Sequence, residues 1–496
     1  MTRLFLAALV AAVVLAIGSP ASAHPGIPLE PTLPTDFTYS ATDNVEYLGR
    51  FPEHTGNAGG QLSPDGRYFY LTDPRGVYVY DVSTPTAPTR VGSITLFQTT
   101  TGVALAQEDP NSNGEILLVD AASTPVGPAQ LQVVDVSDPT SLSVLDTVDV
   151  TDHTWTCVSG RDATGERNSC AYAFGRSGHI VDLTDPSDAT LLPTTWRSAV
   201  GYGDRSNNPY THDLTEIRPG LVMSAGSTAI LMDTSDPANP VRLAAIEQPD
   251  RFSSLGYHSV EWGRGGRDRY VVAGTEIAPS GATSNAGSDC VGENSVIETW
   301  DASAVLDGLD DYERGASAEE AFAGRTFTKV DAYDAGARGI FLDGQAPGHV
   351  LYCAHWMELH PSFKKGGRMA VSYYDRGTRF VDIGADGVMN EVGWITAAES
   401  YSGSPQWVSD DVVYIMDYRR GMEIVRLTDM PATRVKHHKG DRIASASIFA
   451  TPSTAGALDR SLAATTALFA ALLFVADRRR RRQRTAVLPV RRDDSR

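Results

Sequence analysis

The stretch Leu131-Gln-Val-Val-Asp135-Val-Ser-Asp-Pro139 decides the fold. Its first part is a short apolar run rich in Val, which is typical of a strand. Asp135 ends the run, and the Ser-Asp-Pro sequence after it favours a turn, because Asp and Ser side chains hydrogen-bond a turn backbone and Pro cannot donate to a strand ladder. The stretch therefore defines a pattern, an apolar strand that ends on Asp and is followed by a turn.

The same pattern occurs seven times along the chain. The marker residues that end its seven strands are Asp81, Asp135, Asp182, Asp233, Asp301, Asp382 and, in the last copy, Arg426. Successive markers lie 54, 47, 51, 68, 81 and 44 residues apart, a period typical of the four-stranded blade of a β-propeller. The sequence thus predicts an all-β propeller of seven four-stranded blades, although the two long intervals, which hold insertions, leave six or eight blades open.

The two ends of the repeat region predict how the ring closes. The seventh copy stops near Leu427, before any fourth strand, while residues 44–51 have the pattern of a fourth strand without a blade of their own. An N-terminal strand that completes the last blade would remove the exposed edge at that point. We therefore expect a propeller over residues 44–428, closed by an N-terminal strand.

These repeats resemble the LVIVD-repeat family of secreted and cell-surface bacterial propellers. The resemblance covers about residues 44–428, and the Val-Val-Asp135-Val-Ser-Asp-Pro139 stretch is its best example. It implies a propeller fold and an exported location. The family motif carries no catalytic residue, so the resemblance implies little about chemistry.

The N-terminus has the pattern of a secretion signal. Arg3 precedes an unbroken apolar run over residues 4–17, and Ala21-Ser-Ala23 offers small residues for cleavage. We predict a signal peptide over residues 1–23, followed by an N-terminal linker over 24–43. An uncleaved anchor is the alternative, but fourteen apolar residues are few for a span, which needs about 20.

The C-terminus has the pattern of a membrane tether. Residues 458–476 are mostly apolar and are followed by a tail, 477–496, with nine Arg against three Asp. Basic residues stay on the cytoplasmic side, so we predict a transmembrane helix over 458–476, a basic cytoplasmic tail, and a stalk over 429–457 that carries the propeller outside. The alternative is an amphipathic terminal helix with a basic tail.

The charge of the chain limits its partners. The net charge is −19 even with the basic tail included, so the remainder is more acidic still. Such a surface repels nucleic acid and anionic lipid. We therefore expect no nucleic-acid partner, and an unknown extracellular protein, glycan or small ligand instead.

Four cysteines lie in the part that we expect to be exported. They are Cys157, Cys170, Cys290 and Cys353. An even number in an oxidising compartment indicates two disulfides. We favour the pairs 157–170 and 290–353, because Cys157 and Cys170 flank a turn-like stretch. A zinc cluster of Cys and His is the alternative, although no Cys-x-x-Cys occurs.

Histidines that precede the marker strands are the main candidates for chemistry. They are His54, His153, His212, His258 and His355. The first strand of each propeller blade lines the central channel, so equivalent positions converge on the axis. Imidazoles there would suit Zn, Cu, Ni or Fe, and Glu261, Glu358 or Asp213 could add oxygen ligands. His360 is a further candidate.

A structural role for these histidines is the alternative, in which each one hydrogen-bonds a neighbouring blade. Strand alternation also places His258 and Glu261 on opposite faces of one strand, which argues against joint ligation. In architecture, though in no continuous motif, the chain is similar to the selenium-binding/methanethiol-oxidase proteins, which are propellers with channel histidines and a bound metal.

One segment has the spacing of a calcium loop. Its oxygen ligands would be Asp109, Asn111, Asn113 and Asp120. Position 12 carries Asp instead of Glu, and strand-like residues follow instead of a helix. Because Asn-Ser-Asn-Gly is also an ordinary hairpin turn, we favour the turn and keep calcium as the alternative.

The sequence favours a membrane-anchored extracellular propeller that acts as a non-enzymatic binding module. A metal-dependent enzyme, an oxidase or a hydrolase, is the alternative function. The acidic insertion over residues 277–344 either forms loops that display binding residues or is a disordered segment without a binding role. The two functions differ in one geometric requirement. A metal-dependent enzyme needs His153, His212, His258 and His355 to meet within about 4–5 Å of one point.

Overall fold

The computed structural model describes twelve segments of the chain. They are residues 39–56, 59–96, 108–121, 130–150, 152–202, 211–247, 256–276, 296–335, 354–374, 376–397, 400–428 and 435–437. The chain divides into two units, Met1–Arg442 and Ile443–Arg496, and all the described residues belong to the first. The predicted signal peptide, transmembrane helix and basic tail lie outside the described residues. No helix within the described segments is long and apolar enough to cross a membrane.

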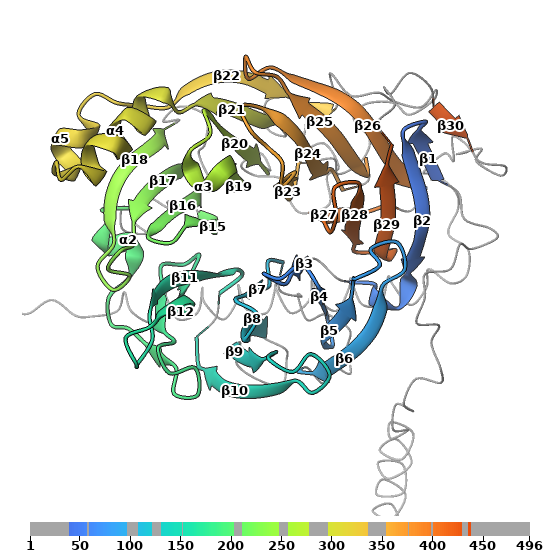
Figure 1. Ribbon diagram of the computed structural model, residues 1–496, viewed down its shortest axis with the longest axis horizontal. Helices are drawn as coiled ribbons and strands as arrows, with labels where there is room; N and C mark the ends of the chain where they lie inside the picture. The colour runs from blue at the N-terminus through green and yellow to red at the C-terminus, as the bar shows by residue number, and fades with distance from the viewer. Residues whose placement is uncertain are drawn as a thin grey trace, which may run out of the picture. The chain divides into compact units, whose positions relative to one another are not determined.

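The described strands form seven antiparallel sheets around a central axis (Figure 1), and we call the region around this axis the channel. Blade I contains β3 (Gly59–Leu62), β4 (Tyr68–Asp73), β5 (Gly76–Asp81) and β6 (Thr89–Thr95). Blade II contains β7 (Asn111–Ser112), β8 (Ile116–Ala121), β9 (Gln130–Asp135) and β10 (Ser143–Val148). Blade III contains β11 (Trp155–Arg161), β12 (Arg167–Gly175), β13 (Ile180–Asp182) and β14 (Thr190–Leu191). Blade IV contains β15 (Thr211–Arg218), β16 (Leu221–Gly226), β17 (Thr228–Asp233) and β18 (Val241–Glu247).

The remaining blades follow the same order, with the first strand of each nearest the channel (Figure 1). Blade V contains β19 (Tyr257–Trp262), β20 (Tyr270–Thr275), β21 (Ile297–Asp301) and β22 (Thr328–Tyr333). Blade VI contains β23 (Met357–Leu359), β24 (Gly367–Ser372), β25 (Thr378–Ile383) and β26 (Met389–Ala397). Blade VII contains β27 (Ser402–Trp407), β28 (Val412–Asp417) and β29 (Gly421–Leu427). The prediction of seven blades is confirmed.

The predicted closure is also confirmed. The strand β2 (Val45–Phe51) pairs antiparallel with β29 as the outer strand of blade VII, with Tyr47 opposite Val425 and Phe51 opposite Met422. Two further strands extend the outer edge of blade VI. They are β1 (Tyr39–Thr42), which pairs with β26, and β30 (Val435–His437), which pairs with β1. Strand pairing therefore extends beyond the predicted limits of 44–428. The prediction stops short because strands of three or four residues are too short to have a recognisable sequence pattern.

The marker Asp has a clear structural role. In five blades it ends the third strand and its Oδ1 accepts a hydrogen bond from the backbone N–H two residues later, at 2.7–2.9 Å. This contact closes the turn that leads to the outer strand. The repeated sequence pattern therefore corresponds to the same turn at the same place in these five blades.

The apolar core is divided between the blades. Eight clusters of apolar side chains lie in the described segments, and seven of them each join a different pair of neighbouring blades, so that the contacts run once around the ring. The second strands β16, β20 and β28 are buried at every position because both of their faces pack against neighbours. Outer strands such as β6 are mostly half-buried or exposed. Burial on both faces explains the continuous apolar runs of the middle strands.

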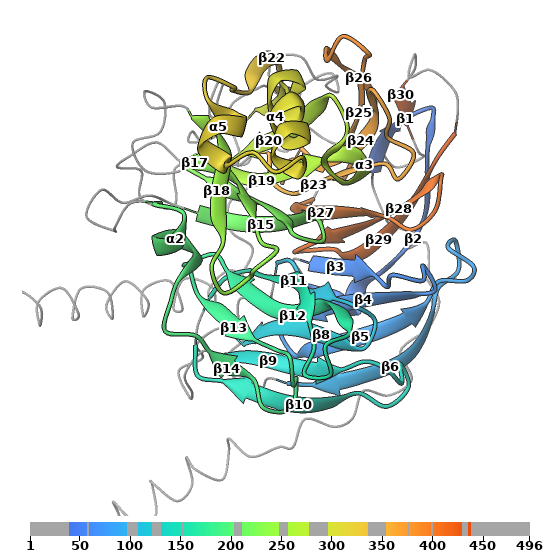
Figure 2. The same ribbon diagram turned by 60° about the vertical axis from the view of Figure 1, so that its left-hand side comes forward.

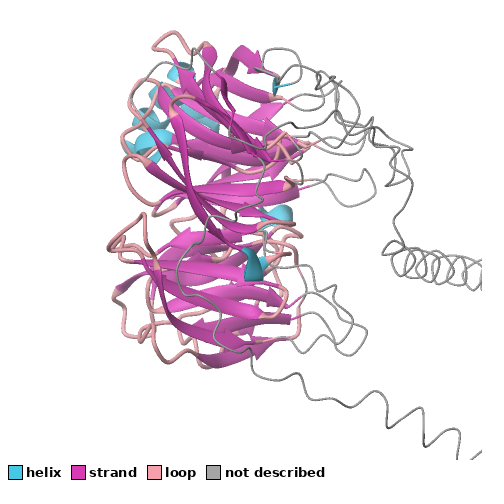
Figure 3. Ribbon diagram, turned by 90° about the vertical axis from the view of Figure 1, so that its right-hand side faces the viewer, coloured by secondary structure: helices cyan, strands magenta, loops and turns pink. Residues whose placement is uncertain are grey.

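Helices occur only in connections within the described segments (Figures 2 and 3). They are η1 (Pro52–His54), α2 (Trp196–Ala199), α3 (Gly263–Gly266), α4 (Ser303–Glu313) and α5 (Ala318–Phe322). The pair α4 and α5 fills part of the predicted insertion and lies beside β18 (Figure 2), where Val305 and Leu309 join the core between blades IV and V.

A disulfide joins Cys157 to Cys170, as predicted, across the β11–β12 hairpin of blade III. Cys290 and Cys353 lie outside the described residues, so their pairing stays a prediction. The bond closes a loop with a sequence separation of 13 residues.

Changing both Cys157 and Cys170 to Ala is expected to lower the free energy of unfolding by about 3 kcal/mol, because a loop of this length loses about that much closure entropy. Urea unfolding of the full chain followed by tryptophan fluorescence measures the change. Ser169→Ala, an exposed position beside Cys170, is the control and should stay within about 0.5 kcal/mol of the wild type. A similar small change in the double variant would contradict the prediction.

Candidate metal centre in the channel

Four of the predicted histidines meet in the channel. His212 lies in β15 and His258 in β19, the innermost strands of blades IV and V. His153 and His355 each stand two residues before the innermost strand of their own blade, β11 and β23. The four imidazoles therefore come from four consecutive blades, III to VI, at or just before the innermost strand of each.

The histidines surround one carboxylate that the sequence analysis does not identify. Glu108, just before the innermost strand β7 of blade II, places its Oε2 close to the Nε2 atom of every one of them. The separations are 3.1 Å to His153, 3.6 Å to His212, 3.8 Å to His258 and 3.6 Å to His355. A second carboxylate, Glu276, places its Oε2 3.5 Å from the Nε2 of His258.

The geometry of this cluster fits a transition-metal ion. Metal bonds of about 2.0–2.1 Å in a tetrahedral site put ligand atoms about 3.3 Å apart, which is near the distances observed here. Two overlapping sets have all their ligand atoms within 4.8 Å of one another, Glu108 with His212 and His258, and Glu276 with His258 and His355. A donor set of imidazole and carboxylate suits Zn, Cu, Fe or Ni.

β-Bulges aim the two central histidines at this point. The pairing of β15 with β16 passes from Thr211 to Asp213 and skips His212. The pairing of β19 with β20 passes from Tyr257 to Ser259 and skips His258. A bulged residue leaves the regular alternation of its strand and its side chain takes a new direction. The alternation argument against joint ligation by His258 and Glu261 agrees with the structure, because Glu261 lies in neither close set of possible ligands in the described residues.

The imidazoles pack as a row along the channel. Ring centroids lie 4.9 Å apart for His153 and His212, 3.6 Å for His212 and His258, and 4.3 Å for His258 and His355. Trp356 contacts the two central rings edge-on. Rings this close repel one another when charged, so the row favours neutral imidazoles.

The electrostatics agree with metal-ligand protonation states. Burial lowers the pKa of His212 and His258 well below the usual value, and the neighbouring histidines lower both further. Burial alone would raise the pKa of Glu108, but His153 and His355 outweigh it and hold that pKa well below its usual value. The two central imidazoles, His212 and His258, are therefore favoured in the neutral form and Glu108 in the ionised form, the forms that bind metals, whereas Glu108 outweighs burial and raises the pKa of His153.

Two observations concern the orientation of the rings. The Nδ1 of His355 lies 2.6 Å from the carbonyl oxygen of Gly403, so an Nδ1–H donor there leaves the Nε2 lone pair facing the cluster. His258 is 1% exposed, and neither of its ring nitrogens has a hydrogen-bond partner among the described residues. A buried imidazole in that state is uncommon, and a metal ligand bond would satisfy it.

Two tyrosines orient the carboxylates. The Tyr418 hydroxyl donates to Glu108 Oε1 at 2.9 Å, and the Tyr374 hydroxyl donates to Glu276 Oε1 at 2.6 Å. In each case the other carboxylate oxygen faces the histidines. Such contacts are typical of the outer shell of a metal site.

The structure does not bring every predicted candidate to this place. His54 is buried away from the cluster, with Nδ1 3.2 Å from Asp73 Oδ2 and Nε2 2.6 Å from the Tyr80 hydroxyl. It therefore has the structural role that the sequence leaves as an alternative. Glu358 Oε2 accepts a hydrogen bond from the Trp407 backbone N–H of blade VII, and so joins two blades.

Glu261 also lies outside the two close sets of possible ligands in the described residues. Burial and the nearby Asp109 raise its pKa to about 8. Burial also raises the pKa of Asp213 well above its usual value, and Asp109 adds to the shift. The raised pKa values favour the neutral, protonated forms of Glu261 and Asp213. The oxygen donors near the histidines are instead Glu108 and Glu276.

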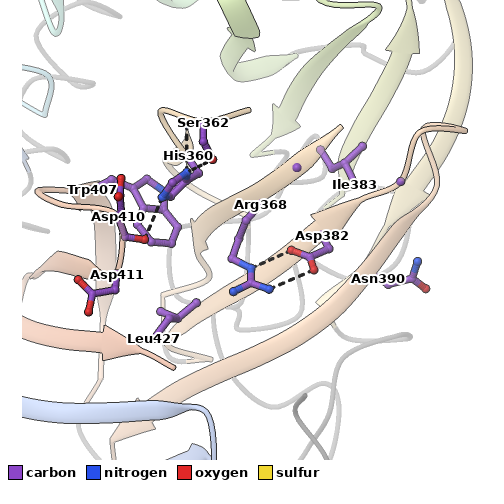
Figure 4. A pocket seen from close by; sticks show the side chains of 12 residues that line it. His360, Ser362, Arg368, Asp382, Ile383, Asn390, Trp407, Asp410, Asp411 and Leu427 are labelled. Atoms are coloured by element: carbon purple, nitrogen blue, oxygen red, sulfur yellow. Dashed lines mark hydrogen bonds and ion pairs between the residues drawn. The ribbon is translucent and has the colours of Figure 1, made fainter. Parts of the chain in front are cut away.

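His360 lies in a separate pocket of 540 Å³ on blades VI and VII (Figure 4). Its Nδ1 lies 2.6 Å from Ser362 Oγ and its Nε2 lies 2.9 Å from the Asp410 carbonyl oxygen. Arg368 and Asp382 form a two-bond ion pair across the same pocket. None of the channel histidines lines it.

The calcium-loop segment forms a hairpin between β7 and β8. Asn113 Oδ1 accepts hydrogen bonds from the backbone N–H groups of Glu115 and Ile116, and the Asn111 side-chain amide donates to Asp109 Oδ2. Asp120 lies inside β8. The preferred turn is therefore present, and calcium binding stays a prediction without support from these contacts.

Glu108 and Glu276 are the residues that sequence reasoning missed. Glu108 precedes its innermost strand by three residues, much as His153 and His355 precede theirs by two. An alignment of the residues that precede each innermost strand would identify Glu108, although the segment that follows it also has the spacing of a calcium loop. Glu276 directly follows β20 and has no repeat equivalent that would mark it.

Comparisons with known proteins add little beyond the fold. No family model matches the chain, so the LVIVD resemblance stays a prediction, and no curated protein matches it. Among solved structures, the chain is similar to the β-propeller domain of Cps50 (Swd1) from Myceliophteria thermophila, with 10% sequence identity and a TM-score of 0.49 over 78% of this chain and 100% of that one. The architecture described above rests on this chain's own strand pairing.

Proposed function

We propose that the propeller binds one transition-metal ion in its channel and is a metal-dependent enzyme. One observation carries the proposal. The Nε2 atoms of four histidines from blades III to VI, His153, His212, His258 and His355, lie 3.1–3.8 Å from one carboxylate oxygen of Glu108 in blade II. Blade packing alone does not require five polar side chains at one place, whereas metal ligation does.

The arrangement supports catalysis more than a structural metal. Structural zinc sites are closed by four ligands and are usually remote from solvent. Here the side chain of His153 is 20% exposed and that of Glu276 is 28% exposed, whereas His258 and His355 are almost fully buried. Solvent and a small substrate can therefore approach from the side of His153 and Glu276. Glu276 would stand beside the reacting group as a proton acceptor or as a further ligand.

Metal analysis tests this function. We expect the untagged full-length chain, produced in an exporting host, to contain close to one Cu, Zn, Fe or Ni per chain by mass spectrometry. His258→Ala should weaken metal binding by more than the roughly 100-fold that outer-shell changes reach, because it removes a central ligand. His360→Ala, a histidine outside the channel, is the matched control and should retain the metal.

A wild-type protein without stoichiometric metal after reconstitution, or a His258→Ala protein that binds metal as tightly as the control, would refute the metal centre. Because His258 is buried, His153→Ala serves as a second variant at a partly exposed position. Circular dichroism of each variant separates metal loss from loss of fold.

Ligand binding is the second candidate function, and the polar pocket of blades VI and VII favours it. Its charged lining suits a small polar ligand or a glycan. We also propose, from the sequence alone, that the chain is exported and tethered by residues 458–476 with the propeller outside. Protease digestion of intact cells tests this location, since only an external propeller would be cut while the cells remain intact.

A further inference from the structure

Three aromatic side chains form a cluster against the metal centre on the side of blades VI and VII. We call Tyr374, Tyr401 and Tyr418 the tyrosine cluster. Ring centroids lie 4.7 Å apart for Tyr374 and Tyr401, and 5.3 Å apart for Tyr401 and Tyr418. The Tyr374 ring lies 4.6 Å from the ring of His355, and the Tyr418 ring lies 6.2 Å from it. The cluster is therefore in contact with a candidate metal ligand.

The cluster also reaches the surface. Tyr401 is partly exposed, and the exposed Arg419 places its guanidinium 4.8 Å from the centre of the Tyr401 ring. A continuous series of rings thus runs from His355 through Tyr374 to Tyr401 at the surface. Electron tunnelling falls steeply with distance, so rings at these spacings exchange electrons readily.

Each of the two inner tyrosines has a proton acceptor in place. Tyr374 donates to Glu276 and Tyr418 donates to Glu108. Loss of an electron from a phenol makes it strongly acidic, and the bound carboxylate can take the proton in the same event.

The backbone of Tyr374 supplies independent support. Its φ is +39°, in the left-handed region that a bulky aromatic residue rarely adopts. Reciprocal backbone hydrogen bonds with Ser402 of blade VII hold it there, at 3.1 and 2.8 Å. Strained backbone of this kind gathers at functional sites. Packing against His355 would not by itself require a tyrosine in this conformation.

We infer that the tyrosine cluster is a one-electron relay between the channel metal and the protein surface, and that the centre therefore performs oxidative rather than hydrolytic chemistry. The inference rests on the proposed metal centre. It assigns Tyr374 and Tyr418 as the electron donors next to the metal and Tyr401 as the exit. A phenol or another one-electron donor at the surface would then give an electron to Tyr401 and so reduce the oxidised cluster.

The step balances with a peroxide as the oxidant. With a metal bound by Glu108 and the channel histidines, hydrogen peroxide would take up two electrons and two protons as its O–O bond breaks, and two waters would form. Tyr374 and Tyr418 each supply one electron and become neutral phenoxyl radicals, and their protons pass through Glu276 and Glu108 to the peroxide oxygens. When Tyr401 reduces the Tyr374 radical, it gives one electron, Tyr374 regains a proton through Glu276, and Tyr401 releases its own proton to solvent.

The test uses the full-length chain loaded with Fe(II) and, in a parallel sample, with Cu(I). Metal content is measured on each sample before hydrogen peroxide is added and the mixture is frozen for electron paramagnetic resonance. We expect a tyrosyl radical signal that narrows when the protein contains ring-deuterated tyrosine. In the Tyr374→Phe/Tyr418→Phe double variant the signal should fall to that of zinc-loaded protein. Tyr401→Phe should retain the radical but lose its fast reduction by added phenol.

Tyr414→Phe is the matched control, because Tyr414 is buried and its hydroxyl donates to the Pro85 carbonyl, away from the histidines. If wild-type protein binds none of Fe, Cu, Zn and Ni, the metal centre is wrong and the relay is wrong with it. If it binds only Zn or Ni, the relay is wrong and the metal centre stands. If metal is bound but no tyrosyl radical forms, or if the double variant gives the wild-type signal, the relay is wrong and the metal centre stands. Phe retains the ring, so the metal content of the variants also reports whether the site has folded.

Discussion

Phe51→Ala is expected to lower the free energy of unfolding by about 3–5 kcal/mol, the usual cost of truncating a buried phenylalanine. Phe51 is the last residue of β2, is 1% exposed and lies opposite Met422 of β29. Its ring packs 5.0 Å from that of Tyr80 in blade I. It therefore contributes to the contact between the first and last blades, where the ring closes.

Equilibrium unfolding of the full chain in guanidinium chloride measures the change. Glu46→Ala in the same strand is the matched control, because Glu46 is exposed and its ion pair with Arg426 is on the surface. Surface pairs contribute little, so the control should change stability by less than about 1 kcal/mol. Equal effects of the two variants would show that β2 does not hold the ring closed.

Asp73→Ala is expected to destabilise the protein by about 3 kcal/mol, because removing one partner of a buried ionic group leaves the others unpaired. The Asp73 side chain is fully buried, lies 3.2 Å from His54 Nδ1, and accepts hydrogen bonds from Arg75. Arg75 is partly exposed, which keeps the expected loss near the lower end of the range for buried pairs. The pair Arg67 and Asp81 in the same blade is more exposed, so Arg67→Ala, which leaves the turn contact of Asp81 in place, is the control.

The same residue gives a pH dependence with a definite sign. Burial works to raise the pKa of Asp73, but hydrogen bonds from His54 and Arg75 outweigh it and lower that pKa. Its contribution to stability is therefore present above the unfolded pKa of about 3.9 and is lost as the pH falls through the lower folded value. Wild type should lose stability more steeply than Asp73→Ala below about pH 4 in urea unfolding. Parallel curves for the two proteins would contradict this assignment.

These results would separate two roles that the sequence treats alike. His54 precedes a marker strand just as His258 does, yet His54 has both ring nitrogens occupied by Asp73 and Tyr80. His258 has no hydrogen-bond partner for either ring nitrogen among the described residues. Spacing shows that a histidine lies near the channel, but only its contacts show whether its lone pair is available to a metal.

Part of the candidate centre is predictable from sequence for a simple reason. Repeated blades place equivalent residues at equivalent distances from the axis, so His153, His212, His258 and His355 have to face the same region. An alignment of blade starts would also include Glu108, whereas Glu276 is not predictable in this way, because it follows the second strand of its blade and has no repeat equivalent. The β-bulges at His212 and His258 are not predictable either, because the sequence rule assumes that side chains alternate regularly along a strand.

The sequence by itself determined the seven blades and their closure. Every blade repeats one local signal, a strand that ends on Asp and a turn, and such signals depend on nearest neighbours along the chain. Only the tertiary structure decided which side chains come together at the candidate metal centre. Five ligand atoms converge because five blades meet at one axis, and the tyrosine cluster forms because residues of blades VI and VII pack together there. Contacts between residues far apart in sequence depend on the closed ring, and no local pattern contains them.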